Sequence, residues 1–324
     1  MKTRVSEILG IAAPVVQGGM AWIADGRLAG SVSAAGGLGV IAAGAAPLSW
    51  IEDQVRRART LAPQAPIGLN IMMMRPDVEA VADLAVDLHI DAVTTGAGSP
   101  AAFIERWKAA GIKVVPVVAQ AAAAARMQRL GADAVIAEGC EAGGHIGEMT
   151  TMALVPQVCD AVDIPVIAAG GIVDARTAAA ACMLGAEGVQ AGTRFLTVDE
   201  CGVAEAYKRK VLEAKDSDTI VTGRLSGHPV RGLKNAWARS VRAQERRAVD
   251  PAELEGIYAG SLRRAVEGDV AGGSCMAGQA AGSVRERKTA AHVVRALSSG
   301  VAAGVAARGR MGVDAAGDEE GVHA

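Results

Sequence analysis

Residues 165–193, PVIAAGGIVDARTAAAACMLGAEGVQAGT, contain one complete strand–helix–strand repeat. The apolar runs 165–171 and 188–193 have the length of buried strands. Residues 174–184 between them predict a helix, which begins at a favoured capping residue, Asp174, and is followed by glycine. Two apolar strands joined by a helical crossover are typical of parallel sheets covered by helices.

The same alternation extends back to the N-terminus. Eight nearly all-apolar strands within about 200 residues favour a closed parallel barrel over an open doubly wound sheet. We therefore predict the α/β class and a (β/α)8 TIM barrel. The predicted strands are 14–18, 38–42, 67–71, 91–96, 113–118, 133–139, 165–171 and 188–193. The predicted helices are 47–60, 77–88, 100–110, 120–130, 152–162 and 174–184, with starts at Ser99-Pro100 and Asp174 and stops at Gly111, Gly131 and Gly185.

The repeat ends after the eighth predicted strand. Residues 1–195 and 257–307 are assigned to the barrel. Residues 196–256 are more polar and basic and lack strand-like repeats, so we expect a small inserted cap or second domain there. Further helices are predicted at 253–267 and 287–307. The tail, residues 308–324, has no apolar period, which predicts disorder.

Composition excludes several classes of function. Lys plus Arg number 33 against 35 Asp plus Glu, and only eight residues are aromatic (Trp 4, Tyr 2, Phe 2), so we expect no nucleic-acid partner. The five cysteines include no close pair, which predicts free thiols, no metal site and a cytoplasmic location. The N-terminal residues fit a signal peptide badly. The uncharged run 28–51 holds five glycines and Pro47, which favours a buried helix, turn and strand over a membrane span.

Glycine follows the seventh and eighth predicted strands, at Gly170-Gly171 and at Gly192-Thr193. In TIM barrels the active face lies at the carboxyl ends of the strands, and a phosphate is often held after strands seven and eight. Glycine lets backbone N–H groups approach an anion, and the Thr193 hydroxyl adds a donor. The two loops indicate a phosphorylated ligand, although tight barrel turns that need small residues would give the same pattern.

The sixth predicted strand leads into EGCEAGGHIG, residues 138–147. Histidine suits proton transfer near neutral pH, and the glycines beside His145 would let it approach a flat ligand. The alternative is a surface histidine with no role. His228, in the inserted segment, has weaker context. The other histidines, without such context, are His89, His292 and His323.

Amide and thioether side chains follow two other strands, in QGGM (17–20) and NIM (70–72). Asn and Gln match the edge of a heterocycle and Met packs on its face, although the methionines also suit a core. The glycine-rich loop GGSCMAGQ (272–279) could fold over the same barrel mouth.

Two motifs in the sequence are assigned no function. Residues 96–101 fit GxGxxA but lack the acidic residue that a dinucleotide site needs, so we expect an ordinary turn. Cys140 and His145 would make a hydrolase pair only if the fold brought the two side chains together.

Seven basic residues against Glu245 give the segment 224–247 a local charge of +6. This charge suits an acidic partner or a cofactor phosphate, and equally a solvated helix face. The basic residues are Arg224, Arg231, Lys234, Arg239, Arg242, Arg246 and Arg247.

From about Ile8 to Val305 the chain resembles the FabK-type enoyl-acyl-carrier-protein reductase II, a flavin enzyme of bacterial fatty acid synthesis within the nitronate monooxygenase (2-nitropropane dioxygenase-like) superfamily. HPVRGLKN (228–235) and the MAGQ loop are more similar to the reductase branch. The resemblance is carried by QGGMAWIADGRLAG (17–30), GLNIM (68–72), VTTGAG (93–98), GADAVIAEGCEAGGHIG (131–147), PVIAAGGI (165–172), GTRF (192–195) and GGSCMAGQAAG (272–282).

The resemblance implies an FMN-bearing barrel, often a homodimer, with no role for Cys140 and with His145 as the catalytic histidine. The cofactor-binding residues that it implies fall into three sets. Those for the FMN phosphate are Gly170, Gly171, Gly192 and Thr193; those near the ring system are Gly18, Gly19, Met20 and Asn70; further contacts are Glu138, Gly143, Gly144, Met276 and Gln279.

The implied activity is the reduction of trans-2-enoyl thioesters on acyl carrier protein, with NADH or NADPH as co-substrate and a monovalent cation as a further candidate. His145 would protonate the α-carbon or hydrogen-bond the enolate oxygen. The alternative within the superfamily is a nitronate monooxygenase that uses O₂, in which His145 would take the α-proton. A third hypothesis is a non-catalytic flavin-binding module.

Overall fold

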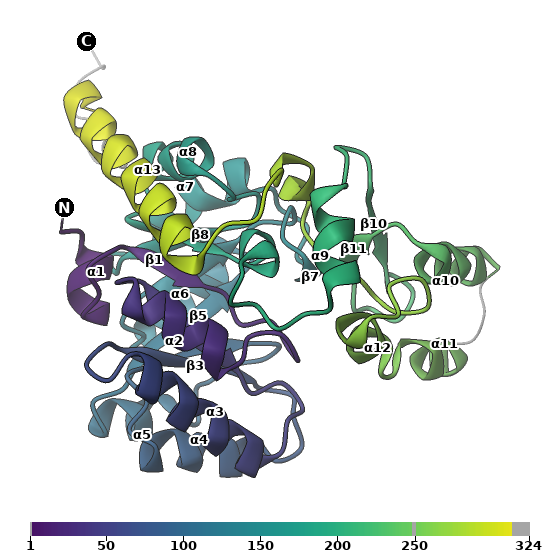
Figure 1. Ribbon diagram of the computed structural model, residues 1–324. Helices are drawn as coiled ribbons and strands as arrows, with labels where there is room; N and C mark the ends of the chain where they lie inside the picture. The colour runs from purple at the N-terminus through teal and green to yellow at the C-terminus, as the bar shows by residue number, and fades with distance from the viewer. Residues whose placement is uncertain (1, 248–250, 313–324) are drawn as a thin grey trace.

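Eight parallel strands close a barrel in the computed structural model, which describes residues 2–247 and 251–312 (Figure 1). The barrel closes because β9 pairs with β1, with Val15 opposite Val189. The TIM barrel prediction is confirmed. Its strands are β1 (Val15–Gln17), β2 (Leu38–Ala42), β3 (Ile67–Met72), β4 (Ala92–Gly96), β5 (Lys113–Val118), β6 (Val135–Glu138), β8 (Val166–Ala169) and β9 (Gly188–Ala191).

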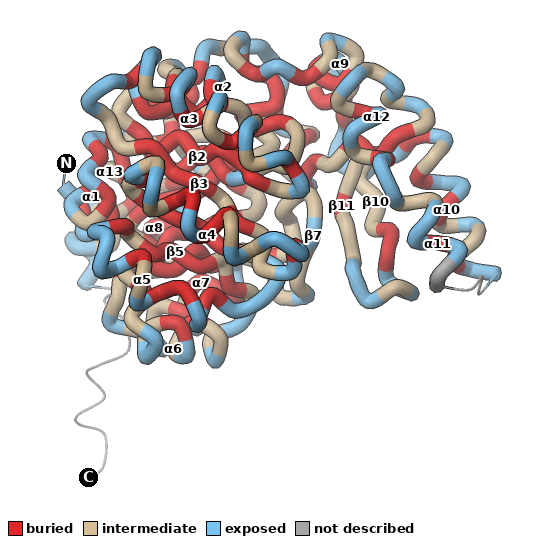
Figure 2. Tube along the Cα trace, turned by 90° about the horizontal axis from the view of Figure 1, so that it is seen from below, coloured by how far each residue is buried: buried red, intermediate tan, exposed pale blue. Residues whose placement is uncertain are grey.

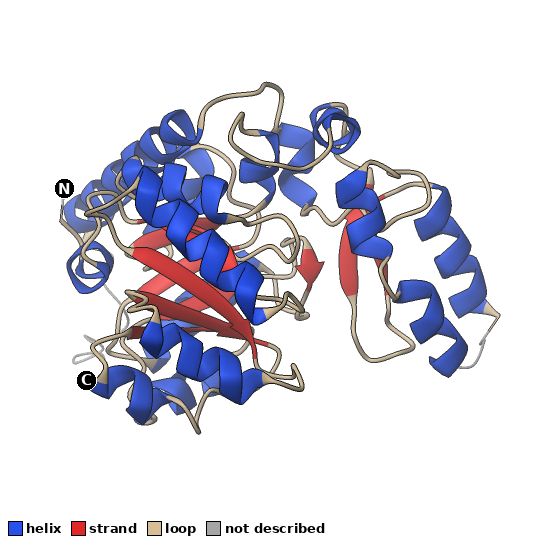
Figure 3. Ribbon diagram, turned by 60° about the horizontal axis from the view of Figure 1, so that its bottom comes forward, coloured by secondary structure: helices blue, strands red, loops and turns tan. Residues whose placement is uncertain are grey.

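Helices surround these strands, as the blue ring around the red strands in Figure 3 shows. The barrel interior is filled by branched aliphatic side chains such as Val40, Val115 and Ile167, and a second apolar layer lies between strands and helices. Figure 2 shows both layers as the buried core. The helices are α1 (Arg4–Leu9), α2 (Gly26–Ala34), α3 (Leu48–Leu61), α4 (Val78–Asp87), α5 (Ile104–Ala109), α6 (Ala121–Arg129), α7 (Thr151–Ala161), α8 (Ala175–Met183) and α13 (Ala290–Met311).

The predicted helix ends are confirmed at one start and three stops. Asp174 caps α8 with a reciprocal capping box, and glycines with positive φ follow α5, α6 and α8 at Gly111, Gly131 and Gly185. The predicted start at Ser99-Pro100 is wrong. Residues 100–103 form a turn first, closed by the bond from Phe103 N to Pro100 O (2.8 Å), so α5 begins at Ile104.

A small lobe, residues 205–278, projects beyond the carboxyl ends of the barrel strands (Figure 1). It contains strands that the sequence does not signal by any repeat: a hairpin of two four-residue strands forms there and is completed by a short strand from the barrel. The lobe elements are α9 (Glu205–Leu212), β10 (Thr219–Thr222), β11 (Val230–Leu233), α10 (Ala236–Arg246), α11 (Pro251–Tyr258) and α12 (Ser261–Glu267); the barrel contributes β7 (Gly144–His145), and 3₁₀ turns lie at Thr193–Thr197 and Gln279–Ser283.

The chain stays with the lobe beyond residue 257, where we expected it to rejoin the barrel. The helix predicted over 253–267 is broken at Gly260, whose φ of 68° is left-handed. The backbone after α12 is held by α10, because Trp237 N donates to Ala271 O (3.0 Å). The barrel resumes with α13, which packs against α8 and α2 in the place of the eighth barrel helix.

Helix α13 also changes the expected tail. It continues through Met311, so residues 308–311 are helical, while residues 313–324 lie outside the described part. By length and composition alone α13 could cross a membrane, with 39% of its most apolar window buried. Its buried residues recur at three- and four-residue spacing, as expected of a helix packed on the barrel. The uncharged run 28–51 forms most of α2, then β2 and the start of α3, as predicted.

Candidate functional site

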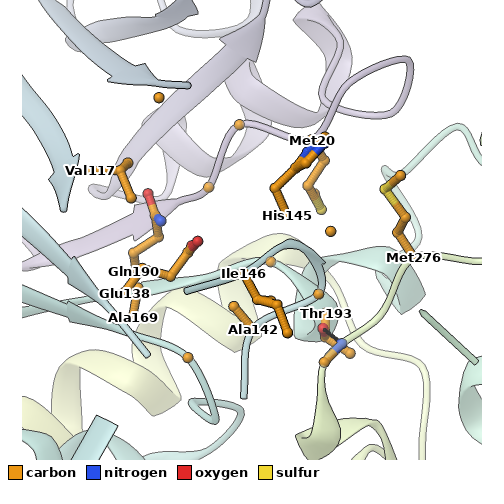
Figure 4. A pocket seen from close by; sticks show the side chains of 18 of the residues that line it. Met20, Val117, Glu138, Ala142, His145, Ile146, Ala169, Gln190, Thr193 and Met276 are labelled. Atoms are coloured by element: carbon orange, nitrogen blue, oxygen red, sulfur yellow. Dashed lines mark hydrogen bonds between the residues drawn. The ribbon is translucent and has the colours of Figure 1, made fainter. Parts of the chain in front are cut away.

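A cavity of about 540 Å³ opens at the carboxyl ends of the barrel strands, beneath the lobe. This volume is typical of small-molecule sites. Both the barrel and the lobe contribute walls. The lining includes Gly18, Gly19, Met20, Asn70, Met72, Gly96, Val117, Glu138, Gly143, Gly144, His145, Gly170, Gly171, Gln190, Gly192 and Thr193 from the barrel, and Gly227, His228, Pro229, Leu262, Met276 and Gly278 from the lobe (Figure 4).

One end of the cavity is a cradle of backbone donors after β8 and β9. Gly170 has a φ of 95°, and a Cβ there would lie 2.8 Å from Gly139 O, so only glycine fits. In the described part of the chain, the N–H groups of Gly171 and Gly192 donate to no protein atom. The Thr193 hydroxyl accepts a bond from Gly278 N (2.9 Å), which leaves its own hydrogen available. These donors suit an anion such as a phosphate.

Bare backbone and one amide form the adjoining wall. A Cβ on Gly19 would lie 2.4 Å from the Asn70 Cβ, and one on Gly18 would lie 3.1 Å from the Gln190 Cδ. Asn70 Nδ2 donates to Thr94 Oγ1 (3.0 Å). Gln17, which we also considered, does not reach the cavity, because its buried amide bonds the backbone of Val40.

His145 lies on β7, a short strand of the barrel that forms the third strand of the lobe sheet. β7 pairs with β11, with His145 opposite Val230, and Ile146 N donates to Pro229 O (3.1 Å). Partial desolvation by the surrounding cavity lowers the pKa of His145, and the charge of His228 lowers it further. The ring is therefore neutral at pH 7, with one nitrogen that donates and one that accepts.

The loop before His145 is fixed from both sides. The Glu141 carboxylate accepts bonds from Thr151 N (2.9 Å) and Thr151 Oγ1 (3.0 Å) at the start of α7. On the lobe side, Arg231 Nε donates to Cys140 O (3.0 Å). A Cβ on Gly143 would lie 2.6 Å from the backbone of Ala277, so the loop and the lobe are in direct contact.

Glu138 ends β6 with its carboxylate in the cavity, close to Gln190 in Figure 4. Burial raises its pKa to about 7. A carboxyl group with this pKa is partly protonated at neutral pH, so it can donate as well as accept a hydrogen bond.

Met276 reaches the cavity from the lobe. Tyr207, fully buried in α9, donates its hydroxyl to Met276 O (2.7 Å), and Met276 forms a bridge with Gly232 of β11. The backbone at Met276 is thus held on two sides while its thioether lines the cavity.

The structure brings all but one of the expected site residues together. Gln279 is the exception: its side chain is exposed, and only its backbone N–H takes part, in a bond to Glu141 O (2.9 Å). Gly96 and Ala97, expected to be an ordinary turn, line the cavity, whereas Cys140 does not. Sequence reasoning missed Gln190 and Glu141 and gave little weight to His228.

The cavity fits FMN by two features of this chain. The unpartnered N–H groups of Gly171 and Gly192 can donate hydrogen bonds to a phosphate. At residues 18–19 the adjoining wall is glycine backbone, with no side chain projecting into the cavity. Within residues 2–247 and 251–312, no cluster of three or more His, Cys, Asp or Glu side chains is placed to hold a metal ion.

Comparisons with known proteins agree with this geometry. A family model described as nitronate monooxygenase matches residues 2–89 and 78–300. The structure of FabK from Thermotoga maritima is similar with a TM-score of 0.91 and 42% identity, covering 97% of this chain and 100% of that one.

Two curated proteins are also similar. One is the "(3aS,4S,5R,7aS)-5-hydroxy-7a-methyl-1-oxo-octahydro-1H-indene-4-carboxyl-CoA dehydrogenase" of Rhodococcus jostii, 38% identical over 74% of this chain and 68% of that protein. The other is a "Probable nitronate monooxygenase" of Staphylococcus saprophyticus, 33% identical over 73% of this chain and 80% of that protein.

Proposed function

The chain belongs to the nitronate monooxygenase family and is a flavin-dependent oxidoreductase, and from this premise we propose that it is an enoyl-acyl-carrier-protein reductase using NADH or NADPH. The observation that carries the proposal is the 42% identity to FabK from Thermotoga maritima across 97% of this chain, because that extent includes most of the lobe that seats Met276 over the cavity.

The residues that would hold FMN are those of the cradle and the adjoining wall. The N–H groups of Gly171 and Gly192 and the Thr193 hydroxyl would bind the phosphate, and Asn70 would hydrogen-bond the ring edge. When bound, FMN supplies hydride-transfer chemistry. The chain supplies binding, orientation and the proton.

His145 is the group that handles the proton. Addition of hydride at the β-carbon of an enoyl thioester requires a proton at the α-carbon and places negative charge on the carbonyl oxygen. A neutral imidazole N–H in the cavity can donate to either atom. Such assistance is worth about 10²- to 10⁴-fold in rate.

The rest of the cavity suits an acyl thioester. Met72, Met74, Ile146 and Leu262 line it with apolar surface. The Rhodococcus relative is named for a carboxyl-CoA substrate, which is also a thioester. We propose an enoyl group as the part that enters the cavity.

The lobe supports acyl carrier protein as the macromolecular partner. Lys234, Arg239 and Arg246 are exposed on or beside α10. A surface hollow of about 440 Å³ lies there, lined by Ile220, Arg239, Arg242, Ala243 and Arg246. A positively charged face of this kind favours an acidic partner.

The second candidate function is nitronate monooxygenase. It is favoured by the family model and by the Staphylococcus relative. The same cavity would take a nitronate, with His145 as the base for the α-proton and O₂ as oxidant. We also propose a homodimer, on the resemblance to the reductase, and a cytoplasmic location, which five free cysteines support.

Two assays separate the candidates. We expect oxidation of NADH or NADPH with a crotonyl thioester under anaerobic conditions, measured at 340 nm, with and without KCl to test the monovalent cation. Oxygen uptake with ethyl nitronate, measured by electrode, is the parallel assay. Nitronate turnover without enoyl turnover would overturn the reductase proposal in favour of the monooxygenase.

A further inference from the structure

The turn between β10 and β11 places a second histidine at the cavity. Residues 223–229 leave the hairpin through Gly223 and return through Gly227, both with positive φ (82° and 75°). His228 N donates to Gly223 O (3.0 Å), which closes the turn. Pro229 O accepts the bond from Ile146 N (3.1 Å), so the turn is attached to the segment that follows His145.

The strand register places His228 beside His145. Val230 lies directly opposite His145 in the antiparallel pair. His228 lies two residues before Val230, where the turn leads into β11, so this pairing brings His228 close to His145. Both side chains line the same cavity and both are exposed, His228 on a turn that also exposes Arg224. His228 is thus a solvent-accessible neighbour of His145.

Two other charged side chains near His145 form hydrogen bonds to groups other than His145. Glu141, in the same loop, is bound to Thr151 of α7, and Arg231 of β11 is bound to Cys140 O. Glu138 of β6 also lines the cavity and lies close to Gln190 (Figure 4). His228 is the charged neighbour whose field lowers the pKa of His145.

We propose that His228 is a proton relay that acts through His145. The inference rests on the proposed reduction of enoyl thioesters, in which NADH or NADPH supplies the hydride and the two electrons. In each turnover His145 gives the proton of one ring nitrogen to the α-carbon and accepts a proton on its other nitrogen. That proton comes from His228, directly or through one water, and His228 takes its replacement from solvent. Both rings then have their starting charge, and proton exchange with solvent returns the His145 proton to the nitrogen from which it left, which restores the starting tautomer.

The first test measures the histidine pair without substrate. In the holoenzyme with ¹⁵N-labelled histidine, His228→Gln should raise the pKa of His145, because the neighbouring cation is lost; the His145 resonances are assigned with His145→Gln. The control is His292→Gln, since His292 is exposed on α13, away from the cavity. An unchanged His145 titration in His228→Gln would overturn the inference.

The second test separates proton transfer from substrate contact. In dilute buffer, His228→Ala should lower kcat for a crotonyl thioester about 10-fold with little change in KM, and added imidazole should restore kcat in proportion to its concentration. A raised KM with no imidazole rescue would assign His228 to substrate contact and overturn the relay. Wild-type protein that gives the expected NMR titration but no enoyl turnover would instead overturn the proposed function.

Discussion

The anion end of the cavity lies within the barrel, on the loops after β8 and β9, whereas the histidine end is shared between the barrel and the lobe. Gly170, Gly171 and Gly192 follow neighbouring strands and need only the barrel to come together. His145 takes its position from β11, a strand 85 residues later in the chain. The difference implies that cofactor binding and proton transfer can be disrupted separately.

The largest expected effect is loss of FMN from the cradle. Gly170→Ala would place a Cβ 2.8 Å from Gly139 O on a backbone with φ of 95°, so the loop must move. We expect purified Gly170→Ala to retain no flavin absorbance near 450 nm. Gly111→Ala is the matched control, because Gly111 has a φ of 82° and nothing within 4 Å of its Cβ position. It should remain yellow, with stability lowered by about 1 kcal/mol. If Gly170→Ala retained flavin, the claim that the backbone donors after β8 and β9 must keep this exact position to bind FMN would be contradicted.

The next effect isolates the histidine end. His145→Ala should retain FMN, because no cradle donor is touched, and should lose about 10²- to 10⁴-fold in kcat with an enoyl thioester. Steady-state kinetics together with the flavin spectrum of the same sample measure both properties. Unchanged kcat would remove His145 from proton transfer, and loss of colour would show that the two ends are not separable.

The third effect concerns Glu138, at the base of the cavity. Because burial raises its pKa from 4.5 to about 7, the unfolded chain loses this proton at lower pH than the folded chain. The burial penalty therefore grows as pH rises from about 4.5 to 7 and is complete above that. Glu138→Gln should stabilise the FMN-free protein by up to about 3 kcal/mol at pH 8, with a smaller gain at pH 5, in urea unfolding. An equal gain at both pH values would show that the carboxylate charge is not the cause.

The smallest expected effect lies outside the cavity, on the basic face of α10. Arg239→Gln combined with Arg246→Gln should raise KM for an enoyl group on acyl carrier protein a few-fold at low salt, while KM for the matching CoA thioester stays constant. Arg56→Gln with Arg57→Gln, on α3 of the barrel, is the charge-matched control. Equal changes for both substrates would contradict docking of the carrier on this face.

The barrel and its cradle could be predicted because their signals are local. Each strand and helix carries its own apolar period, and the glycines stand at the strand ends where the fold needs them. The lobe strands were missed because each has only four residues, TIVT and VRGL, and the residue types do not alternate between apolar and polar; in β11 the burial does alternate, but Arg231 occupies one of the buried positions.

The histidine end depends on register between distant segments, which residue types alone do not specify. His145 was found from its glycine neighbours, but the pairing with β11 that places His228 beside it has no local sequence signal. Gln279 differs from the expectation for a related reason. Its loop does return to the site, through the backbone bond from Gln279 N to Glu141 O, but the Gln279 side chain is exposed and does not line the cavity.

The most direct test of the account is an absorption spectrum of the purified protein, followed by titration of flavin-free protein with FMN. The account predicts maxima near 375 and 450 nm and saturable binding at one FMN per chain, lost in Gly170→Ala. A colourless protein that takes up no FMN would contradict the central claim that the glycine cradle holds this cofactor beside His145.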